Sequence, residues 1–202
     1  MFTEIFLSAF VAALMTFAGS LWIDRLYRTS DELTFPEEIP ERAKFRRPIL
    51  FCALTILICA AQDVWLIAAI FLLALMTATD FEQYMLFDAM TLPLAIIGAA
   101  HVWQAGLNVF DHATAALIGG GIFLLLAVLS RGALGGGDVK LIVALGVWLG
   151  CEKLLSVVLI GTIGGGVAAI VLLLLKKKDR SSYFAYGPYF ALAAIYTLLN
   201  TN

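Results

Sequence analysis

Residues 64–80 read VWLIAAIFLLALMTATD, an apolar run that ends in a carboxylate. Similar runs recur along the 202 residues, of which 62% are hydrophobic and only 14% are charged. A water-soluble globule of this size could not bury so much apolar surface. The composition therefore predicts an all-α, polytopic integral membrane protein with about eight transmembrane helices. The expected spans are 3–23, 47–61, 64–79, 90–105, 113–130, 139–150, 154–175 and 187–200.

The composition also excludes several classes of protein. The net charge of −2 argues against a nucleic-acid partner, and the apolar content argues against intrinsic disorder. The three cysteines form no CxxC pair, so neither a disulfide framework nor a structural zinc site is expected. His101 and His112 have a spacing that suits no common metal motif. The sequence therefore predicts no metal site.

The basic residues indicate how the chain is oriented. If the N-terminus lies outside, all 13 Lys and Arg residues except Lys153 fall on the inner side of the membrane. An even number of spans then places both termini outside. The one sizeable polar stretch, 24–47, is expected to be a cytoplasmic loop on the membrane surface, so that residues 1–202 form a single transmembrane domain. The predicted inner segments are 24–46, 80–89, 131–138 with the adjacent helix start, and 176–186.

Two acidic residues are candidates for chemistry. Asp80 follows the apolar run 64–79, and Asp138 follows a glycine-rich stretch that ends in Gly135-Gly136-Gly137. Both lie at the inner ends of predicted spans, so they can meet if the helices pack side by side. Two facing carboxylates suit amide hydrolysis, because one stays protonated and polarises the carbonyl while the other takes a proton from water. Glycines would let a substrate backbone approach closely.

Simpler roles for these residues stay open. Asp138 is alternatively the N-cap of the helix that follows it, and Asp80 an interfacial carboxylate held by water or by Lys140. Asp88 has the position of an N-cap for the span 90–105. Intramembrane carboxylates also occur in transporters. Two further patterns, Gly146-x-x-x-Gly150 and Gly161 to Gly165, predict close helix packing.

The stretch Gly132-Ala-Leu-Gly-Gly-Gly-Asp138-Val-Lys140 closely resembles the G-x-G-D signature of the type IV prepilin peptidases, which are membrane aspartic proteases. The segment from Asp80 to Pro93 is similar to the family's earlier motif, and Gly187-Pro188 resembles the start of its final span. The resemblance implies that Asp80 and Asp138 are the catalytic dyad. It also implies a supporting or substrate-binding role for four residues: Asp88, Gly135, Gly137 and Lys140.

The implied reaction removes the leader peptide of type IV prepilins or type II secretion pseudopilins. The resemblance places the site at the cytoplasmic face of the bacterial inner membrane, with a prepilin and the lipid bilayer as partners. Many members carry a larger cytoplasmic domain with CxxC motifs and methylate the new N-terminus with S-adenosylmethionine. The loop 24–47 contains no cysteine, so we expect a peptidase without that cofactor. Phe87 replaces a common proline, which predicts a different loop shape after Asp80.

Two alternatives come from other classes of protein. One is a small membrane transporter that depends on these carboxylates, and the other is a non-catalytic assembly factor of a pilus or secretion system. Transporter sites usually lie near the middle of the membrane, whereas Asp80 and Asp138 are predicted at its inner side. Neither a particular prepilin nor an oligomeric state is predicted.

Overall fold

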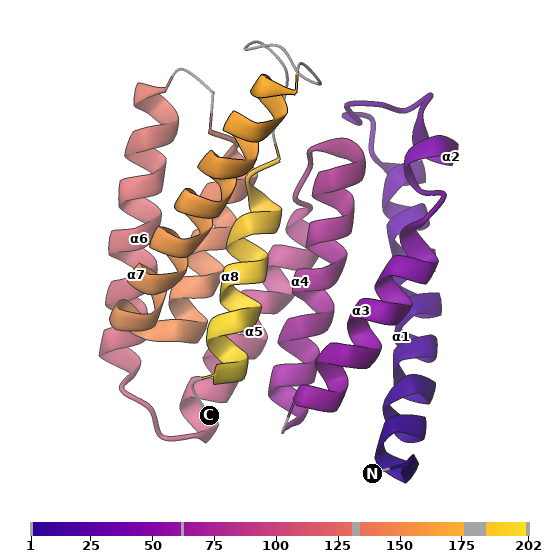
Figure 1. The fold of residues 1–202 in the computed structure, drawn as a ribbon. Coiled ribbons are helices and arrows are strands. Elements are labelled where there is room, and N and C mark those ends of the chain that lie inside the picture. Colours follow the sequence, from indigo (N-terminus) through magenta and orange to yellow (C-terminus); the bar gives the residue numbers. More distant parts are fainter. Residues whose placement is uncertain (1, 62, 131–133, 176–184, 201–202) are drawn as a thin grey trace.

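The computed structural model describes residues 2–61, 63–130, 134–175 and 185–200, and these form a bundle of helices without a strand (Figure 1). The predicted all-α class is confirmed. The elements are α1 (Phe2–Thr29), α2 (Ile39–Arg42), α3 (Arg46–Ala60), α4 (Val64–Gln83), α5 (Asp88–Gln104), α6 (Val109–Leu129), α7 (Gly136–Leu174) and α8 (Gly187–Asn200).

Four of these helices, α1, α4, α6 and α7, are long and apolar enough to cross a membrane. By contrast, α3, α5 and α8 contain 15, 17 and 14 residues. These lengths fall below the roughly 20 residues that a helix needs to cross the hydrocarbon layer. The prediction of a membrane protein therefore has a structural basis, whereas the count of about eight spans stays a prediction.

Helix α7 is broken at Gly150, where the backbone has φ 72° and ψ −179°. Only glycine adopts this conformation readily. Both ends of α7 lie at the same end of the bundle, so the chain reverses at Gly150 (Figure 1). The two halves correspond to the predicted runs 139–150 and 154–175. Asp111 of α6 fixes the reversal, because its carboxylate accepts a hydrogen bond of 3.2 Å from the Cys151 amide.

The glycine patterns have two different roles. Gly146 packs closely on the backbone of Ala116 in α6, and Gly161 packs on Phe190 in α8, as the spacing predicted. Gly165 likewise lies against Tyr186. Gly150 is in addition the reversal point of the chain, and a Cβ there would clash with Oδ2 of Asp111 in α6, so the predicted close packing holds at this position as well.

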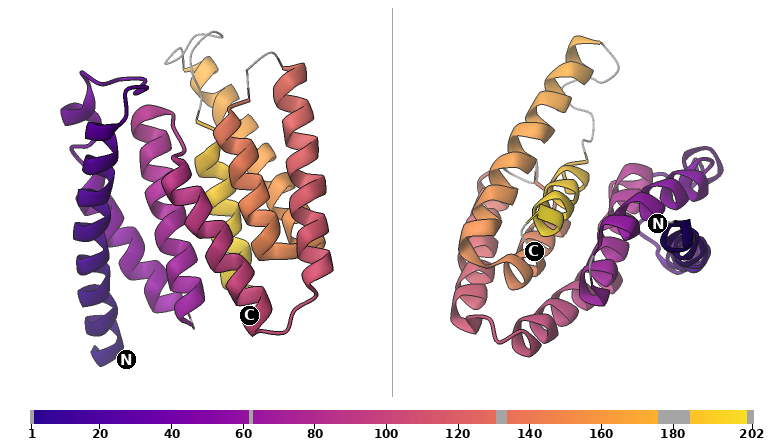
Figure 2. Two further views of the ribbon diagram at one scale, coloured as in Figure 1. Left: turned by 180° about the vertical axis from the view of Figure 1, so that it is seen from behind. Right: turned by 60° about the horizontal axis from the view of Figure 1, so that its bottom comes forward.

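Helix α4 lies at the centre of the bundle. It packs against α3 on one side and against α5 and α8 on the other, while α7 packs against α5, α6 and α8. The core includes the fully buried Leu73, Leu75 and Met76 of α4 and Leu141 and Leu145 of α7. Figure 2 shows α1 and α3 on one flank of α4, with α6 and α7 on the opposite flank.

The termini share one end of the bundle, whereas α2, the turn between α4 and α5, and the start of α7 lie at the other end (Figures 1 and 2). This arrangement agrees with the inner segments predicted at 24–46, at 80–89 and at the start of α7, whereas 131–133 and most of 176–186 lie outside the described residues. The predicted loop 24–47 has different bounds, because α1 continues to Thr29, α3 begins at Arg46, and the short α2 lies between them. The last turn of α4 and the first turn of α7 therefore come to the same end of the bundle.

Candidate active site

Asp80 lies on the last turns of α4 and is buried. The helix ends at Gln83, and Tyr84 follows in the left-handed conformation, with φ 52°. The Tyr84 amide donates a hydrogen bond of 2.9 Å to the carbonyl of Asp80, which closes the final turn. The position of Asp80 therefore depends on how the end of α4 is held.

Asp138 lies in the first turn of α7 and is also buried. The N-cap of this helix is Gly135, so the alternative that Asp138 serves as the N-cap is wrong. The Asp138 amide donates to the Gly135 carbonyl at 3.1 Å, and the Gly135 amide in turn interacts with the Asp138 carboxylate. The glycine-rich turn thus contacts the side chain of Asp138, which follows it in the sequence.

The two carboxylates line a single cavity of about 220 Å³. They lie close enough for an electrostatic interaction between them, although they are far apart in the sequence. The amide of Gly187, at the start of α8, also interacts with the Asp80 carboxylate. The buried oxygen Oδ2 of Asp80 has no hydrogen-bond partner among the described residues. Such an unpaired buried oxygen is uncommon in folded proteins. The other lining residues are Tyr84, Met85, Leu86, Gly135, Gly136 and Gly137.

Two glycines are required for this packing. A Cβ at Gly137 would lie 2.9 Å from the Cβ of Leu86, and one at Gly187 would lie 2.7 Å from Oδ2 of Asp80. A Cβ at Gly136, by contrast, meets no described atom within 4 Å. The predicted role of Gly137 in shaping the site therefore has a steric basis, and Gly135 contributes its backbone to Asp138.

The sequence profile of the type IV leader peptidase family matches residues 65–170, more than half of the chain. The chain belongs to this family. The resemblance to the prepilin peptidases is thereby confirmed, and the protein is a peptidase enzyme. The family assignment therefore replaces the two alternatives considered from the sequence, a membrane transporter and a non-catalytic assembly factor.

Three curated relatives of this chain are named prepilin leader peptidase/N-methyltransferase. The one from Xanthomonas campestris pv. campestris is 30% identical, over 82% of this chain and 68% of its own. The protein from Escherichia coli (strain K12) is 31% identical, over 75% and 72% respectively. The one from Pectobacterium carotovorum subsp. carotovorum is 30% identical, over 75% and 57%. No solved structure matches the chain significantly.

Asp88 and Lys140 form an ion pair between α5 and α7. The Lys140 ammonium donates to both carboxylate oxygens of Asp88 at 2.7 Å. Neither belongs to the described residues that line the site, and their side chains are 67% and 57% exposed. Lys140 therefore pairs with Asp88, not with Asp80. Phe87 is the N-cap of α5 and Asp88 its first residue, so the predicted N-cap is wrong by one position.

Sequence reasoning did not select Tyr84, Met85, Leu86 or Gly187 as site residues. The first three lie between the two acidic positions of the earlier motif, and Gly187 begins the predicted final span. The Gly-Pro pair was the available signal for Gly187, because a glycine before a helix start often allows close approach of the backbone. For Tyr84 the sequence carried no such signal, since a tyrosine rarely adopts a positive φ.

The histidines lie away from the cavity, in aromatic and backbone contacts. His101 stacks on Trp148 with a centroid distance of 5.2 Å, and a ring nitrogen of His112 lies 2.8 Å from the carbonyl of Val147. Within the described part of the chain, no group of three or more His, Cys, Asp or Glu residues is placed to hold a metal ion.

Proposed function

We propose that this peptidase removes the leader peptide of type IV prepilins or type II secretion pseudopilins, using Asp80 and Asp138 as its catalytic carboxylates. The supporting observation is that these two buried carboxylates, from α4 and α7, line one cavity and interact electrostatically. The names of the relatives supply the substrate class. The basic residues near the same end of the bundle favour an orientation with the site at the cytoplasmic face of the inner membrane.

The proposed reaction is hydrolysis by an activated water molecule. Two close carboxylates avoid carrying two negative charges, so the pair shares one proton. The protonated carboxyl donates a hydrogen bond to the scissile carbonyl oxygen, and the ionised one takes a proton from water as its oxygen attacks the carbonyl carbon. A tetrahedral intermediate forms. The C–N bond then breaks as the leaving nitrogen accepts a proton, which yields a free carboxylate and a free amine.

The glycine turn provides a surface for the substrate in this proposal. Gly135, Gly136 and Gly137 line the cavity without side chains, so an extended peptide can approach their backbone. The apolar helix that follows the cleavage site in a prepilin would lie in the bilayer beside the enzyme. A groove of about 340 Å³ between α5 and α7, which Asp88 and Lys140 flank, lies next to the glycine turn. We propose a supporting role for this ion pair at the edge of the substrate path.

The test of the proposed dyad replaces each carboxylate by an amide of the same shape. We expect Asp80→Asn and Asp138→Asn each to reduce the cleavage rate of a prepilin by about 10²–10⁴-fold, since each removes a proton-transfer group. Asp31→Asn is the matched control, because Asp31 is exposed. Cleavage is measured with the purified full chain in lipid vesicles. Wild-type rates in both dyad variants would contradict the proposal.

We also propose that the reaction ends at hydrolysis, without methyl transfer from S-adenosylmethionine. The loop between α1 and α3 is short and contains no cysteine. Mass spectrometry of the product formed in the presence of S-adenosylmethionine distinguishes the outcomes. A product with a free, unmodified amine is expected, and a product that carries one added methyl group would refute this part.

A further inference from the structure

The end of α4 is held by contacts that the proposed hydrolysis does not use. Three residues of the segment that leads into α3 make them: Phe35, Arg42 and Arg46. With their partners Glu82 and Gln83 in the final turn of α4, they are here called the α4 clamp. Glu82 and Gln83 follow Asp80 by two and three positions. A polar stretch that was expected to lie on the membrane surface therefore packs on the helix that carries a site residue.

Gln83 makes the most specific of these contacts. Its side chain is fully buried. Its amide group donates a hydrogen bond of 3.1 Å to the carbonyl of Phe35 and accepts one of 2.8 Å from the Phe35 amide. This pair of hydrogen bonds resembles the pairing of two adjacent β-strands. It satisfies the hydrogen-bonding groups of both the Gln83 side chain and the Phe35 backbone. It fixes the last helical residue of α4 against the preceding loop.

Arg42 joins the loop to the same turn of α4. It donates a hydrogen bond of 3.2 Å to the carbonyl of Glu82, and its guanidinium lies 3.8 Å above the ring of Phe35. The Phe35 ring in turn makes an edge contact with Tyr84, at a centroid distance of 5.5 Å. Tyr84 lines the cavity and has an uncommon backbone conformation for a residue other than glycine. The contacts therefore hold Tyr84 in a conformation that it would not favour alone.

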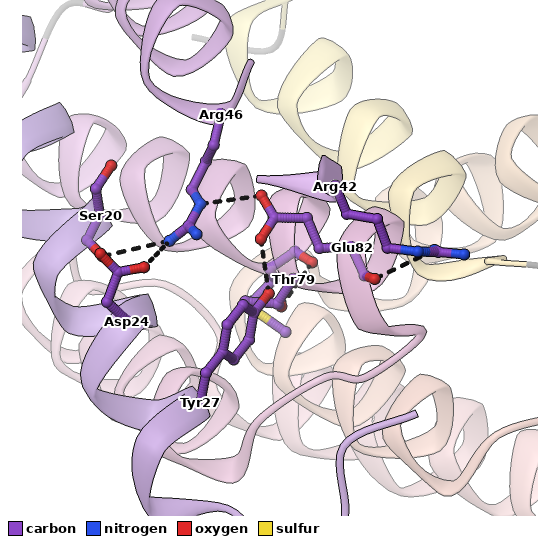
Figure 3. Close-up of polar contacts among 8 residues, drawn as sticks. Ser20, Asp24, Tyr27, Arg42, Arg46, Thr79 and Glu82 are labelled. Carbon is purple, nitrogen blue, oxygen red and sulfur yellow. Dashed lines mark hydrogen bonds and ion pairs between the residues drawn. The ribbon is translucent and has the colours of Figure 1, made fainter. Parts of the chain in front are cut away.

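Arg46 joins three helices, and Figure 3 shows its guanidinium between Asp24 and Glu82. The guanidinium lies 3.0 Å from Glu82 and 2.8 Å from Asp24, and the side chain is only 4% exposed. The Tyr27 hydroxyl donates to the second Glu82 oxygen at 3.0 Å. Because Asp24 and Tyr27 belong to α1, this network ties α1, α3 and α4 together at Glu82, two residues after Asp80.

We infer that the α4 clamp positions the catalytic site, and that Gln83 and Arg42 are positioning residues of the peptidase reaction. The clamp fixes the turn that closes through the hydrogen bond from Tyr84 to the carbonyl of Asp80. Loss of the clamp lets this turn shift, and with it the Asp80 carboxylate and the Tyr84 wall of the cavity. The inference rests on the proposed function of Asp80. A purely structural clamp would instead change only the stability of the fold.

Two variants test the clamp without introducing a buried charge. Gln83→Met keeps the length of the side chain and removes both hydrogen bonds to Phe35. Arg42→Lys keeps the positive charge and removes the planar group that stacks on Phe35. The matched controls are Gln104→Met and Arg47→Lys, which make the same changes at exposed positions. The full chain is assayed in lipid vesicles with a prepilin that has a basic leader, a glycine and an apolar helix.

The expected result is a loss in kcat with little change in KM. A misplacement of about 1 Å can cost up to about 100-fold in rate, so we expect kcat to fall by about 10- to 100-fold in both clamp variants. The controls should keep wild-type kcat, and the melting temperatures of all variants should stay within a few degrees of the wild type. Wild-type kcat in both clamp variants overturns the inference. So does a fall in activity that, in Arg42→Lys as well as in Gln83→Met, only accompanies a lower melting temperature.

A second measurement reports on the geometry without catalysis, and it keeps the inference testable if Gln83→Met folds poorly. Asp80→Cys and Asp138→Cys are combined after Cys52, Cys59 and Cys151 are replaced by alanine. A short bis-methanethiosulfonate reagent should join the pair efficiently, and adding Arg42→Lys should lower the yield at least about threefold. An unchanged yield overturns the inference. Active Asp80→Asn and Asp138→Asn variants would instead refute the proposed dyad, so the two failures are distinguishable.

Discussion

Replacing Gly187 by alanine tests the contact between α8 and the Asp80 carboxylate. The added Cβ would lie 2.7 Å from Oδ2 of Asp80 and 3.1 Å from Cδ1 of Leu86. Ordinary contacts begin at 3.4 Å, so the carboxylate must move by about 0.7 Å or α8 must retreat. Since misplacement by about 1 Å can cost up to about 100-fold, we expect kcat/KM to fall by about 10- to 100-fold. This loss corresponds to about 1.4–2.7 kcal/mol of transition-state stabilisation.

The assay follows prepilin cleavage by the purified peptidase in lipid vesicles, together with its thermal unfolding. Gly121→Ala is the matched control, because its Cβ meets no described atom within 4 Å and Gly121 lies in α6, outside the lining of the cavity. The control should keep at least about half of the wild-type kcat/KM. If Gly187→Ala retains wild-type kcat/KM and wild-type stability, then the position of Asp80 does not depend on α8, and the geometric reasoning is refuted.

Three other changes have outcomes that follow from the structure. Gly150→Ala should lower the free energy of unfolding by about 1–3 kcal/mol in a denaturant titration, because alanine does not fit the backbone conformation of Gly150. An unchanged value would contradict the conclusion that the chain reversal requires glycine. Arg46→Met should lower the free energy of unfolding by about 3–5 kcal/mol in the same titration, because it leaves the buried Glu82 carboxylate without its cation. A decrease below about 1 kcal/mol would show that the network contributes little to stability. Asp88→Asn should change the free energy of unfolding by less than about 1 kcal/mol, because its ion pair with Lys140 is exposed, and a larger loss would point to a role beyond that pair.

The meeting of Asp80 and Asp138 could be predicted from sequence because two independent patterns agreed. Apolar runs gave the helix ends, and the distribution of basic residues placed the ends with Asp80 and Asp138 on the same side. Placing a carboxylate at the end of an apolar membrane span costs free energy, so such a residue is a candidate for a function. This reasoning selected Asp80 and Asp138. The fold class therefore followed from hydropathy and charge, whereas the assignment of Asp80 and Asp138 as a catalytic dyad also rested on the resemblance to the prepilin peptidases.

The α4 clamp could not be predicted in the same way. Hydropathy indicates that a segment is helical, but it assigns charged residues near a helix end to water or to the membrane surface. Arg46 and Glu82 are buried because each satisfies the other, and they are 36 positions apart in the sequence. The pair between Gln83 and the Phe35 backbone spans 48 positions. Partners at such distances leave no periodic signal, so a buried polar network resembles a solvated loop in the sequence.

The site is built from three helix ends, and this arrangement bears on its charge. Asp138 lies in the first turn of α7, and Asp80 contacts the amide at the start of α8. The N-terminus of a helix carries a partial positive charge that stabilises a nearby anion. Two such helix ends can stabilise one negative charge in a buried cavity. A second negative charge would be destabilised both by burial and by repulsion from the first. This arrangement is consistent with the proposed mechanism, in which the two carboxylates share a single proton, the state that general acid–base hydrolysis requires.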